Sequence, residues 1–495
     1  MRLSYALGLV VLCIAARGAE LGIALNEDDS HFYMFRPAEA MSVVGLNAFV
    51  DQYAGTGVTE LFLCPNAQKA SYRSKVFTPV WELNGTQRAP EPGVPTQWLA
   101  NAKLLDERGL DAYTAWIARC REKHIAPWLS MRMNDIHNVD DKDSYIHSKF
   151  WREHPEYWRV PGSSSGSWTD RALDYGVAEV RAYSMAFVKE LLERYDPDGL
   201  ELDWMRFGYH FRPGHEAEGA EVLTQFVREA RALTNAAAAK RGHPIQLGVR
   251  VPTHPDAAKG LGMDAVRWAE EGLIDRIVAT PFWATTDYDI PMELWRERLG
   301  EHAKQARLCA GAEILLRAHP GGKAVEQDVA SARGFAAGQL ERGADQVYLF
   351  NFMDPEPMQG PKGSYQDLLR GGFDAEKLAG LPQRYPVTYH DTVAPGMSNG
   401  AVLPVDLAKG VETTFHVGRV REGAPLALVL GQDAAGLKEA GAVTVEINGA
   451  SCALTATDAG NVFRLPTGSV KSGANVVRVK AEKAATIDWL ELRVN

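Results

Sequence analysis

The 495-residue sequence predicts an α/β fold, a (β/α)8 TIM barrel with a C-terminal β-sandwich domain. Three observations lead to this prediction. Short apolar segments alternate with longer amphipathic segments from residue 21 to about residue 380, which is typical of a parallel α/β fold. Eight such units can be counted, the number that closes a barrel. After Pro386 the helical periodicity stops and short alternating segments follow.

Eight apolar segments are the expected strands of the barrel. They span residues 21–25, 60–64, 126–132, 199–204, 246–251, 276–281, 307–313 and 346–351. Helical periodicity is clear between several of them, as in 177–194 and 216–240. The competing fold, a doubly wound open sheet, usually carries a glycine-rich phosphate loop after its first strand. Here Glu27, Asp28 and Asp29 follow that strand, which favours the barrel.

The chain divides into three expected parts: residues 1–19 as a signal peptide, 20–385 as the barrel and 386–495 as the sandwich. Arg2 precedes an apolar stretch at 6–16, and small residues at 16–19 suit cleavage, so we expect a secreted or periplasmic protein. No later stretch reaches the roughly 18 apolar residues of a transmembrane helix. In the sandwich, Trp489 is the only tryptophan and is expected to belong to the core. We therefore expect this domain to pack against the barrel rather than to bind glycan.

The formal net charge of -10, without a long run of Lys or Arg, argues against nucleic acid or an anionic membrane as a partner. A carbohydrate is the expected partner, for the reasons that follow. No cofactor and no metal is expected, and the oligomeric state is open.

Polar residues collect at the ends of the expected strands. In a TIM barrel the active site is built there, from the C-terminal strand ends and the loops that follow them. The residues so placed are Asn26, Asp28, Arg132, Asn134, Asp135, His137, Asp203, Arg206, Arg250, Trp283, Asp287, Glu313 and Asn351.

Two acids of the fourth strand should face the barrel axis. Leu200, Leu202 and Trp204 alternate with Glu201 and Asp203, so the acids take the inward positions if the apolar residues face the helices. Glu201 lies deeper, and we expect it to form a buried ion pair with an arginine of a neighbouring strand, Arg132 or Arg250. Asp203 lies at the mouth, where a buried carboxylate is more often functional.

Hydrolysis of a glycosidic bond needs two carboxyl groups, one that protonates the leaving oxygen and one that acts as nucleophile or base. Asp203 is the first candidate. Glu313 is the leading second, because a lone acid in an apolar segment should have a raised pKa, as a general acid requires. Asp287 and Asp135 are the substitutes. The residues expected to bind sugar are Asn26, Asp28, Arg132, Asn134, Asp135, His137, Arg206, Arg250, Trp283 and Asn351.

Several short motifs carry a resemblance to a known group. They are Arg132-Met133-Asn134-Asp135, His154-Pro155-Glu156, Leu173-Asp174-Tyr175, Val180-Arg181, the segment Asp198 to Asp203, and Ile274-Asp275. Over most of residues 21–352 the chain resembles the secreted barrel hydrolases called family-10-like glycosyl hydrolases. The resemblance implies a barrel and a glycan substrate, and it leaves the sugar and the catalytic pair open.

The fourth-strand segment also resembles the D-G-x-D-x-D-x-E motif of family 18 chitinases. Met205 stands where that motif has its catalytic Glu, and Glu201 replaces an Asp, so substrate-assisted chitinase chemistry is not expected. Barrel glycosidases with a Glu after strands four and seven match only at Glu313. Those with an Asp nucleophile on strand four and an acid on strand six match Asp203 and, loosely, Asp287.

Two rival functions remain open. A catalytically silent glycan-binding barrel would explain the missing Glu at Met205. A metal-dependent hydrolase would have to use Asp28, His137, Asp203 and His254, although no metal-binding spacing supports it. Arginines at the site would suit an acidic or sulfated glycan, unless Glu201 neutralises Arg132 and Arg250.

Overall fold

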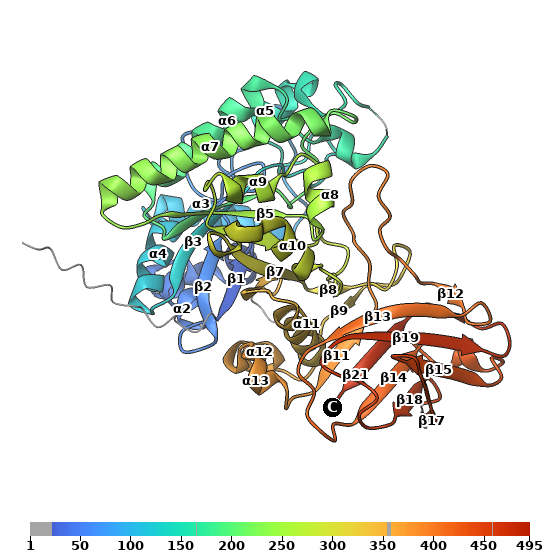
Figure 1. Cartoon of the computed structure of the whole chain (residues 1–495). Helices are drawn as coiled ribbons and strands as arrows, with labels where there is room; N and C mark the ends of the chain where they lie inside the picture. Colours follow the sequence, from blue (N-terminus) through green and yellow to red (C-terminus); the bar gives the residue numbers. More distant parts are fainter. Residues whose placement is uncertain (1–21, 165, 354–357, 458) are drawn as a thin grey trace, which may run out of the picture.

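The computed structural model describes residues 22–164, 166–353, 358–457 and 459–495 (Figure 1). The expected signal peptide, residues 1–19, lies outside the described residues. Within them, no helix combines the length and the apolar character needed to cross a bilayer.

Eight strands form a closed barrel, which confirms the predicted fold. Their order around the barrel is β1-β10-β7-β6-β5-β4-β3-β2, and every neighbouring pair is parallel. The strands are β1 (Ile23–Glu27), β2 (Val58–Leu63), β3 (Ala126–Arg132), β4 (Gly199–Asp203), β5 (Gln246–Val251), β6 (Arg276–Ala279), β7 (Arg307–Glu313) and β10 (Gln346–Phe350). Each lies on one of the eight expected segments.

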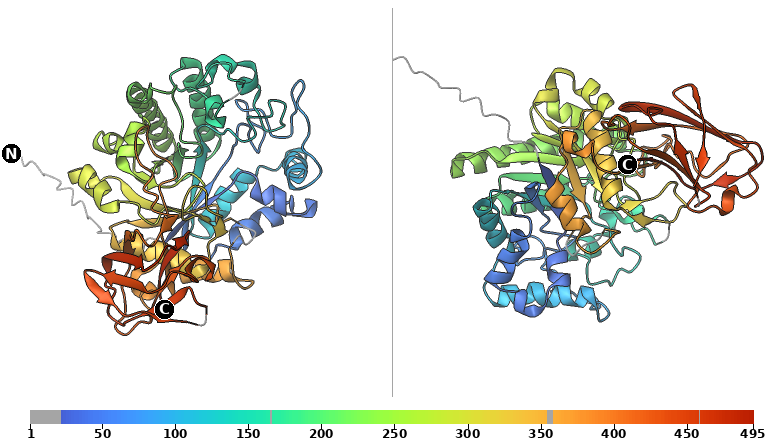
Figure 2. Two further views of the ribbon diagram at one scale, coloured as in Figure 1. Left: turned by 90° about the vertical axis from the view of Figure 1, so that its right-hand side faces the viewer. Right: turned by 90° about the horizontal axis from the view of Figure 1, so that it is seen from below.

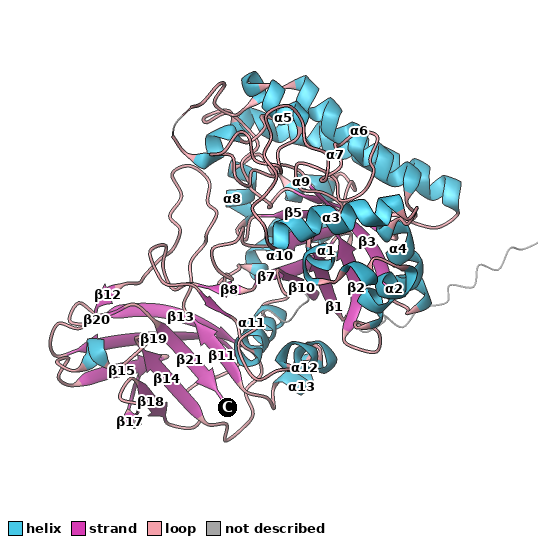
Figure 3. Ribbon diagram, turned by 180° about the vertical axis from the view of Figure 1, so that it is seen from behind, coloured by secondary structure: helices cyan, strands magenta, loops and turns pink. Residues whose placement is uncertain are grey.

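Helices surround the barrel, and the long helices α6 and α7 pack against one another along one side (Figure 3). A short hairpin, β8 (Leu315–Leu316) with β9 (Val325–Glu326), follows β7. The helices are α1 (His31–Phe35), α2 (Val43–Asp51), α3 (Val94–Glu107), α4 (Ala112–Glu122), α5 (Lys149–Glu153), α6 (Ala178–Arg194), α7 (Glu216–Arg241), α8 (Pro255–Gly260), α9 (Ala265–Glu270), α10 (Met292–Leu299), α11 (Val329–Glu341), α12 (Ser364–Gly371) and α13 (Ala375–Leu378).

Side chains fill the barrel interior. Near the N-terminal strand ends, Trp128 stacks on Phe62 with ring centroids 4.9 Å apart. A Cβ atom at residue 199 would lie 2.4 Å from the Trp128 ring, so this strand position requires glycine. Arg276 and Glu60 form a buried ion pair of 2.5 Å at the same level. These side chains therefore fill the barrel interior on the N-terminal side, and the open space lies at the C-terminal mouth.

The C-terminal region is a β-sandwich, as predicted, and lies beside the barrel (Figure 2). Its five-stranded sheet has the order β11-β21-β14-β18-β17 and its four-stranded sheet the order β13-β19-β15-β16, all antiparallel, with β12 and β20 paired separately. Apolar side chains of both sheets form one core. The strands are β11 (Gln383–Pro386), β12 (Val405–Asp406), β13 (Val411–Val417), β14 (Leu426–Leu430), β15 (Val443–Ile447), β16 (Ala450–Cys452), β17 (Thr455–Ala456), β18 (Val462–Leu465), β19 (Gly473–Ala481), β20 (Thr486–Ile487) and β21 (Leu490–Val494).

Strand β11 contains residues on both sides of the expected boundary at 385/386, and the division into domains stays a prediction. Helix α11 of the barrel packs directly on β11 and β13. A Cβ at Gly334 would lie 2.1 Å from the carbonyl oxygen of Arg384, so the helix approaches the sheet more closely than an alanine would allow. Arg384 also pairs with Asp328 at 2.5 Å and Glu491 at 2.7 Å, which ties the sheet to the start of α11.

The 387–400 loop, between β11 and β12, runs from the sandwich to the barrel mouth beside α8 (Figure 1). The carboxylate of Asp391 accepts three backbone N–H bonds of 2.8–2.9 Å from residues 282, 283 and 284, in the loop after β6. His390 bonds Asp287 of that loop at 2.6 Å. The 387–400 loop therefore clamps the loop that follows β6.

Candidate active site

A cavity of about 450 Å³ opens at the C-terminal ends of the barrel strands, where the sequence predicts the site. Its walls include residues at the ends of β1, β2, β3, β4, β6, β7 and β10 or in the loops that follow them. Seven of the predicted site residues line it: Asp28, Arg132, His137, Arg206, Trp283, Glu313 and Asn351.

Glu313, the last residue of β7, is 1% exposed and lines the cavity. Both of its carboxyl oxygens accept from Nδ2 of Asn351, at 2.8 Å each. Asn351 follows β10 with φ = 60°, in the left-handed region that asparagine adopts more readily than most residues. Burial raises the pKa of Glu313 to about 8, so this carboxyl keeps its proton at neutral pH.

Asp28 and Asp29, which follow β1, share the guanidinium of Arg132. Although burial opposes ionisation, Arg132 holds the pKa of Asp28 well below its usual range. Burial and the negative charge of Asp28 raise the pKa of Asp29 well above its usual value. The cavity therefore combines an ionised carboxylate, Asp28, with a carboxyl that is protonated at neutral pH, Glu313, and with Asp29, whose pKa is raised.

A hydrogen-bonded chain joins Asp135, His137 and Arg206. His137 Nδ1 lies 2.8 Å from Asp135 Oδ1, and its Nε2 lies 2.9 Å from Arg206 Nη2. An arginine can only donate, so Nε2 accepts and the proton of His137 sits on Nδ1, directed at Asp135. Asp135 is itself buried and also bonds Arg132 at 3.2 Å, so it lies behind the cavity wall and orients the groups in front of it.

Asp203 does not line the cavity, and its side chain is 1% exposed. Its Oδ2 pairs with Arg250 at 2.6 Å, and its Oδ1 accepts from the backbone N–H groups of Met205 and Arg206 at 3.0 and 2.9 Å. The ion pair that we expected for Glu201 is thus formed by Asp203. The strand register explains the difference, because Asp203 lies opposite Arg250 on β5, whereas Glu201 lies opposite Gly248.

Glu201 belongs to a buried network one level below the mouth. It accepts from Ser130 Oγ at 2.7 Å and from the hydroxyl of Tyr348 at 2.8 Å, and Asn26 Nδ2 donates to that same hydroxyl at 2.8 Å. Burial raises the pKa of Glu201 to about 7. Asn26 is therefore held within the barrel and does not line the cavity.

Two further candidates hold loops in place. Asn134 donates to the carbonyl oxygens of Leu173 and Tyr209 at 2.9 Å each, and it accepts from the backbone N–H of Leu173. Asp287 is fully buried against His390, and this charge pair raises the pKa of His390 to about 9. Neither Asn134 nor Asp287 lines the cavity.

Aromatic rings gather beside the entrance. Trp283 is 44% exposed and lines the cavity, as predicted. Trp168, 40% exposed, stacks on Phe282 with centroids 5.9 Å apart and meets Phe207 edge-on at 5.7 Å. Phe207 has φ = 69°, a strained conformation for a bulky residue, and its ring lies against His137. Exposed rings of this kind can stack on the apolar faces of sugars.

The residues of the metal-dependent alternative have other partners. Asp28 bonds Arg132, His137 bonds Asp135, and Asp203 bonds Arg250. Within the described ranges of the chain, no three or more His, Cys, Asp or Glu side chains are arranged to hold a metal ion.

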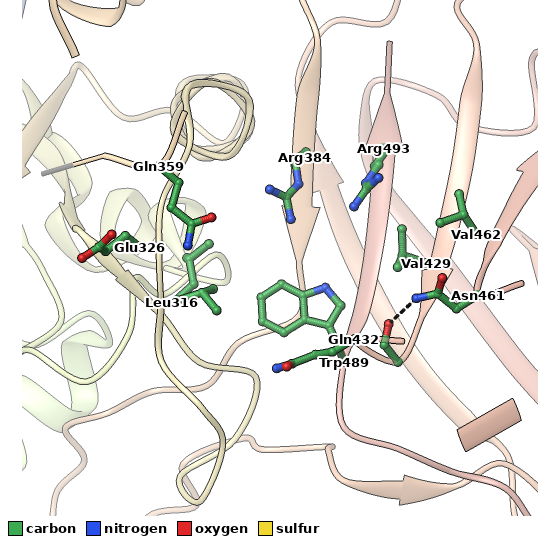
Figure 4. Close-up of a pocket in the computed structure, with 12 residues that line it drawn as sticks. Leu316, Glu326, Gln359, Arg384, Val429, Gln432, Asn461, Val462, Trp489 and Arg493 are labelled. Carbon is green, nitrogen blue, oxygen red and sulfur yellow. Dashed lines mark hydrogen bonds between the residues drawn. The ribbon is translucent and has the colours of Figure 1, made fainter. Parts of the chain in front are cut away.

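A second cavity of about 330 Å³ lies between the β8–β9 hairpin and the sandwich (Figure 4). Figure 4 shows Trp489 between Leu316 on the barrel side and Asn461 on the sandwich side. Trp489 is 5% exposed and donates to Glu491 at 3.0 Å. Among the described residues that line this cavity, Glu326 is the only carboxylate, so this cavity lacks the second carboxyl that hydrolysis of a glycosidic bond requires.

Sequence reasoning did not select Asp29, which lines the cavity, or Tyr348 and Phe207, which contact residues around it. Asp29 stands in the acidic run after the first strand, and that run was a usable signal. The same side-chain alternation that we applied to the fourth strand would also have predicted that Tyr348 of β10 points into the barrel. No sequence signal marks Phe207, since its position depends on a left-handed backbone conformation.

No family model matches the chain, and no curated protein matches it. Solved structures that resemble it include α-L-fucosidase isoenzyme 2 from Paenibacillus thiaminolyticus, with 12% identity, 71% of this chain and 48% of that chain covered, and a TM-score of 0.44. The PgaB (BpsB) glycoside hydrolase domain from Bordetella bronchiseptica matches with 10% identity, 68% and 95% coverage and a TM-score of 0.41. The GH36 α-galactosidase AgaB from Geobacillus stearothermophilus matches with 13% identity, 93% and 55% coverage and a TM-score of 0.36.

All three names describe glycoside hydrolases. The chain spans about half the length of the fucosidase. At these identities and TM-scores the similarities assign neither a family nor an activity to the chain.

Proposed function

We propose that the protein is a secreted glycoside hydrolase of the family-10-like kind, which cleaves O-glycosidic bonds of an oligo- or polysaccharide at the barrel mouth. The observation that carries this proposal is the contrast between two carboxyls that line one cavity, protonated Glu313 and ionised Asp28. Acid-catalysed cleavage of a glycosidic bond needs one carboxyl in each state.

Glu313 takes the role of general acid. A carboxyl with a pKa near 8 is protonated at neutral pH and can transfer its proton to the leaving oxygen without a large energetic cost. The amide of Asn351 bonds both carboxyl oxygens and fixes the orientation of the group toward the cavity. After proton transfer, the same amide and the charge of Arg206 stabilise the carboxylate that forms.

The second carboxyl is the nucleophile or the base that activates water, and Asp28 supports this role best. Its side chain is 11% exposed and faces the cavity, whereas that of Asp203 is 1% exposed. Its charge is maintained by Arg132, and hydrogen bonds of 3.0 and 2.8 Å from Ser30 fix its position. Asp203, the partner expected from the sequence, remains the alternative, and Asp287 would need to leave His390 to take part.

Substitution of both carboxyls tests the proposal. Glu313→Gln and Asp28→Asn should each lower turnover on a glycan that the parent protein cleaves by roughly 100- to 10,000-fold. Glu297→Gln, an exposed position on α10, is the matched control and should leave turnover unchanged. Release of reducing sugar across a panel of neutral and acidic glycans provides the assay.

Three results would contradict the proposal. Full activity in Glu313→Gln would show that Glu313 is not the general acid. Full activity in Asp28→Asn, together with loss of activity in a folded Asp203→Asn variant, would transfer the second role to Asp203. Binding of glycans by the parent protein without any turnover would support the catalytically silent barrel instead.

A further inference from the structure

Arg206 is a buried cation of the cavity wall, and no described carboxylate forms an ion pair with it. It is 8% exposed and lines the cavity. Its Nη2 donates to the neutral Nε2 of His137 at 2.9 Å, its Nε has no hydrogen-bond partner, and no ion pair is formed by its guanidinium among the described residues. Burying an arginine without a directly bonded counter-charge is costly, so an anionic group bound in the cavity would stabilise Arg206.

The carboxylates around Arg206 bond other groups and act on it only at a distance. Arg132 pairs with Asp28, and Arg250 pairs with Asp203 at 2.6 Å. The nearby acid Asp135 is shared between Arg132 and His137. Glu313, also close enough to influence Arg206, is the protonated acid of the proposed mechanism.

A second arginine, Arg317, lies beside the rim against the ring of Trp283. The guanidinium carbon of Arg317 lies 5.6 Å from the ring centroid of Trp283, which lines the cavity. Nε of Arg317 is likewise without a hydrogen-bond partner, and no ion pair of Arg317 occurs in the part of the chain that the structure describes. The entrance thus combines an aromatic face for a sugar ring with a free positive charge.

We propose that Arg206 forms the anion-binding subsite of this cavity and that the substrate is a glycan whose sugar at this position carries an anionic group, a carboxylate or a sulfate ester. The inference deepens the proposed function and rests on it. Arginine suits either group, because its planar fork donates two parallel hydrogen bonds to a pair of anionic oxygens. The aromatic ring of Trp283, with Arg317 over it, would hold the next sugar of an acidic chain.

Binding of defined sugars tests this inference without requiring turnover. The probes are glucuronate, galacturonate and glucose 6-sulfate, with glucose and galactose as neutral counterparts, measured by calorimetry on the full-length protein. The parent should bind at least one class of anionic sugar more tightly than its neutral counterpart. Arg206→Met should weaken that binding by at least about tenfold and leave neutral sugars unaffected.

Two further variants control for structural damage. Arg206→Lys retains the charge without the planar fork and should restore part of the anion binding if the variant folds like the parent. Arg298→Met removes an exposed arginine that pairs with Asp256 and should change nothing. Comparison of the uronates with the sulfate ester shows which anionic group the subsite selects.

The outcomes separate this inference from the proposed function. Equal or tighter binding of neutral sugars, absence of binding for every anionic probe, or unchanged anion binding in Arg206→Met would overturn the anion subsite, even if neutral glycans are hydrolysed. Anion binding that depends on Arg206, without hydrolysis of any glycan, would retain the subsite and reject the hydrolase.

Discussion

Replacing Asp203 by Asn should destabilise the barrel, because it leaves Arg250 without its counter-charge. The side chains are 1% and 0% exposed, and the ion pair measures 2.6 Å. The asparagine oxygen can still accept the two backbone N–H bonds at the start of the following loop, so the substitution removes the charge and leaves the local turn intact.

The expected cost is at most about 3 to 5 kcal/mol, the range found when one partner of a buried ion pair is removed and the other stays uncompensated. Glu201→Gln should cost much less at pH 6, since a pKa of about 7 leaves this carboxyl mostly neutral, and a glutamine can still accept from Ser130 and Tyr348. The charge of Asp203 opposes ionisation of Glu201. In Asp203→Asn that charge is absent, so Glu201 ionises more readily and can serve as a substitute partner for Arg250.

The double variant Asp203→Asn/Glu201→Gln should therefore lose more stability than the sum of the two single variants, by at least ~0.5 kcal/mol. Urea unfolding at pH 6, followed by tryptophan fluorescence, measures all three differences. If Asp203→Asn unfolds at the parent's midpoint while Glu201→Gln loses several kcal/mol, then Glu201 is the partner of Arg250 and the described pairing is wrong.

Three further predictions concern pH, the clamp and the seam between barrel and sandwich. Burial raises the pKa values of Glu27, Glu201 and Glu313 to about 8, 7 and 8 from an ordinary value of 4.5. Their contribution to stability is therefore complete below pH 4.5 and is lost as pH rises through 7 to 8, by at most about 1.4 kcal/mol per pH unit for each group. A urea midpoint that is flat or rises between pH 5.5 and 8.5 would refute this. Asp391→Ala removes the acceptor of three backbone N–H bonds and so releases the loop after β6, which should raise KM more than it lowers kcat. Steady-state kinetics on a cleaved glycan checks this, and an unchanged KM would contradict it. Gly334→Ala should lower the melting temperature, because its Cβ would lie 2.1 Å from a carbonyl oxygen of β11. The control is Gly371→Ala at an exposed helix end, where a Cβ has open space and the melting temperature should not fall.

Much of the fold could be predicted because periodicity records which face of an element is buried. The alternation on the fourth strand correctly turned Glu201 and Asp203 inward, and both acids are buried. The same pattern could not give their partners. Which acid meets Arg250 depends on the register between β4 and β5, a property of pairing across strands that no single segment contains.

The candidate site was predictable to the extent that it depends on strand ends. Glu313 ends β7 and Asp28 follows β1, and their place on the cavity wall follows from topology. Asp287 also follows a strand, but its environment is set by His390, more than a hundred residues later in the chain. Contacts of this kind come from the 387–400 loop, whose path no local pattern indicates.

That path has a consequence for shortened chains. The eight barrel strands end at residue 350, yet the acceptor that fixes the loop after β6 is residue 391. The entrance to the cavity is therefore completed only by residues that follow β11, the first strand of the sandwich. A truncated product that ends at β10 would have a barrel with an unfinished mouth, so a full-length chain is a condition for a finished site.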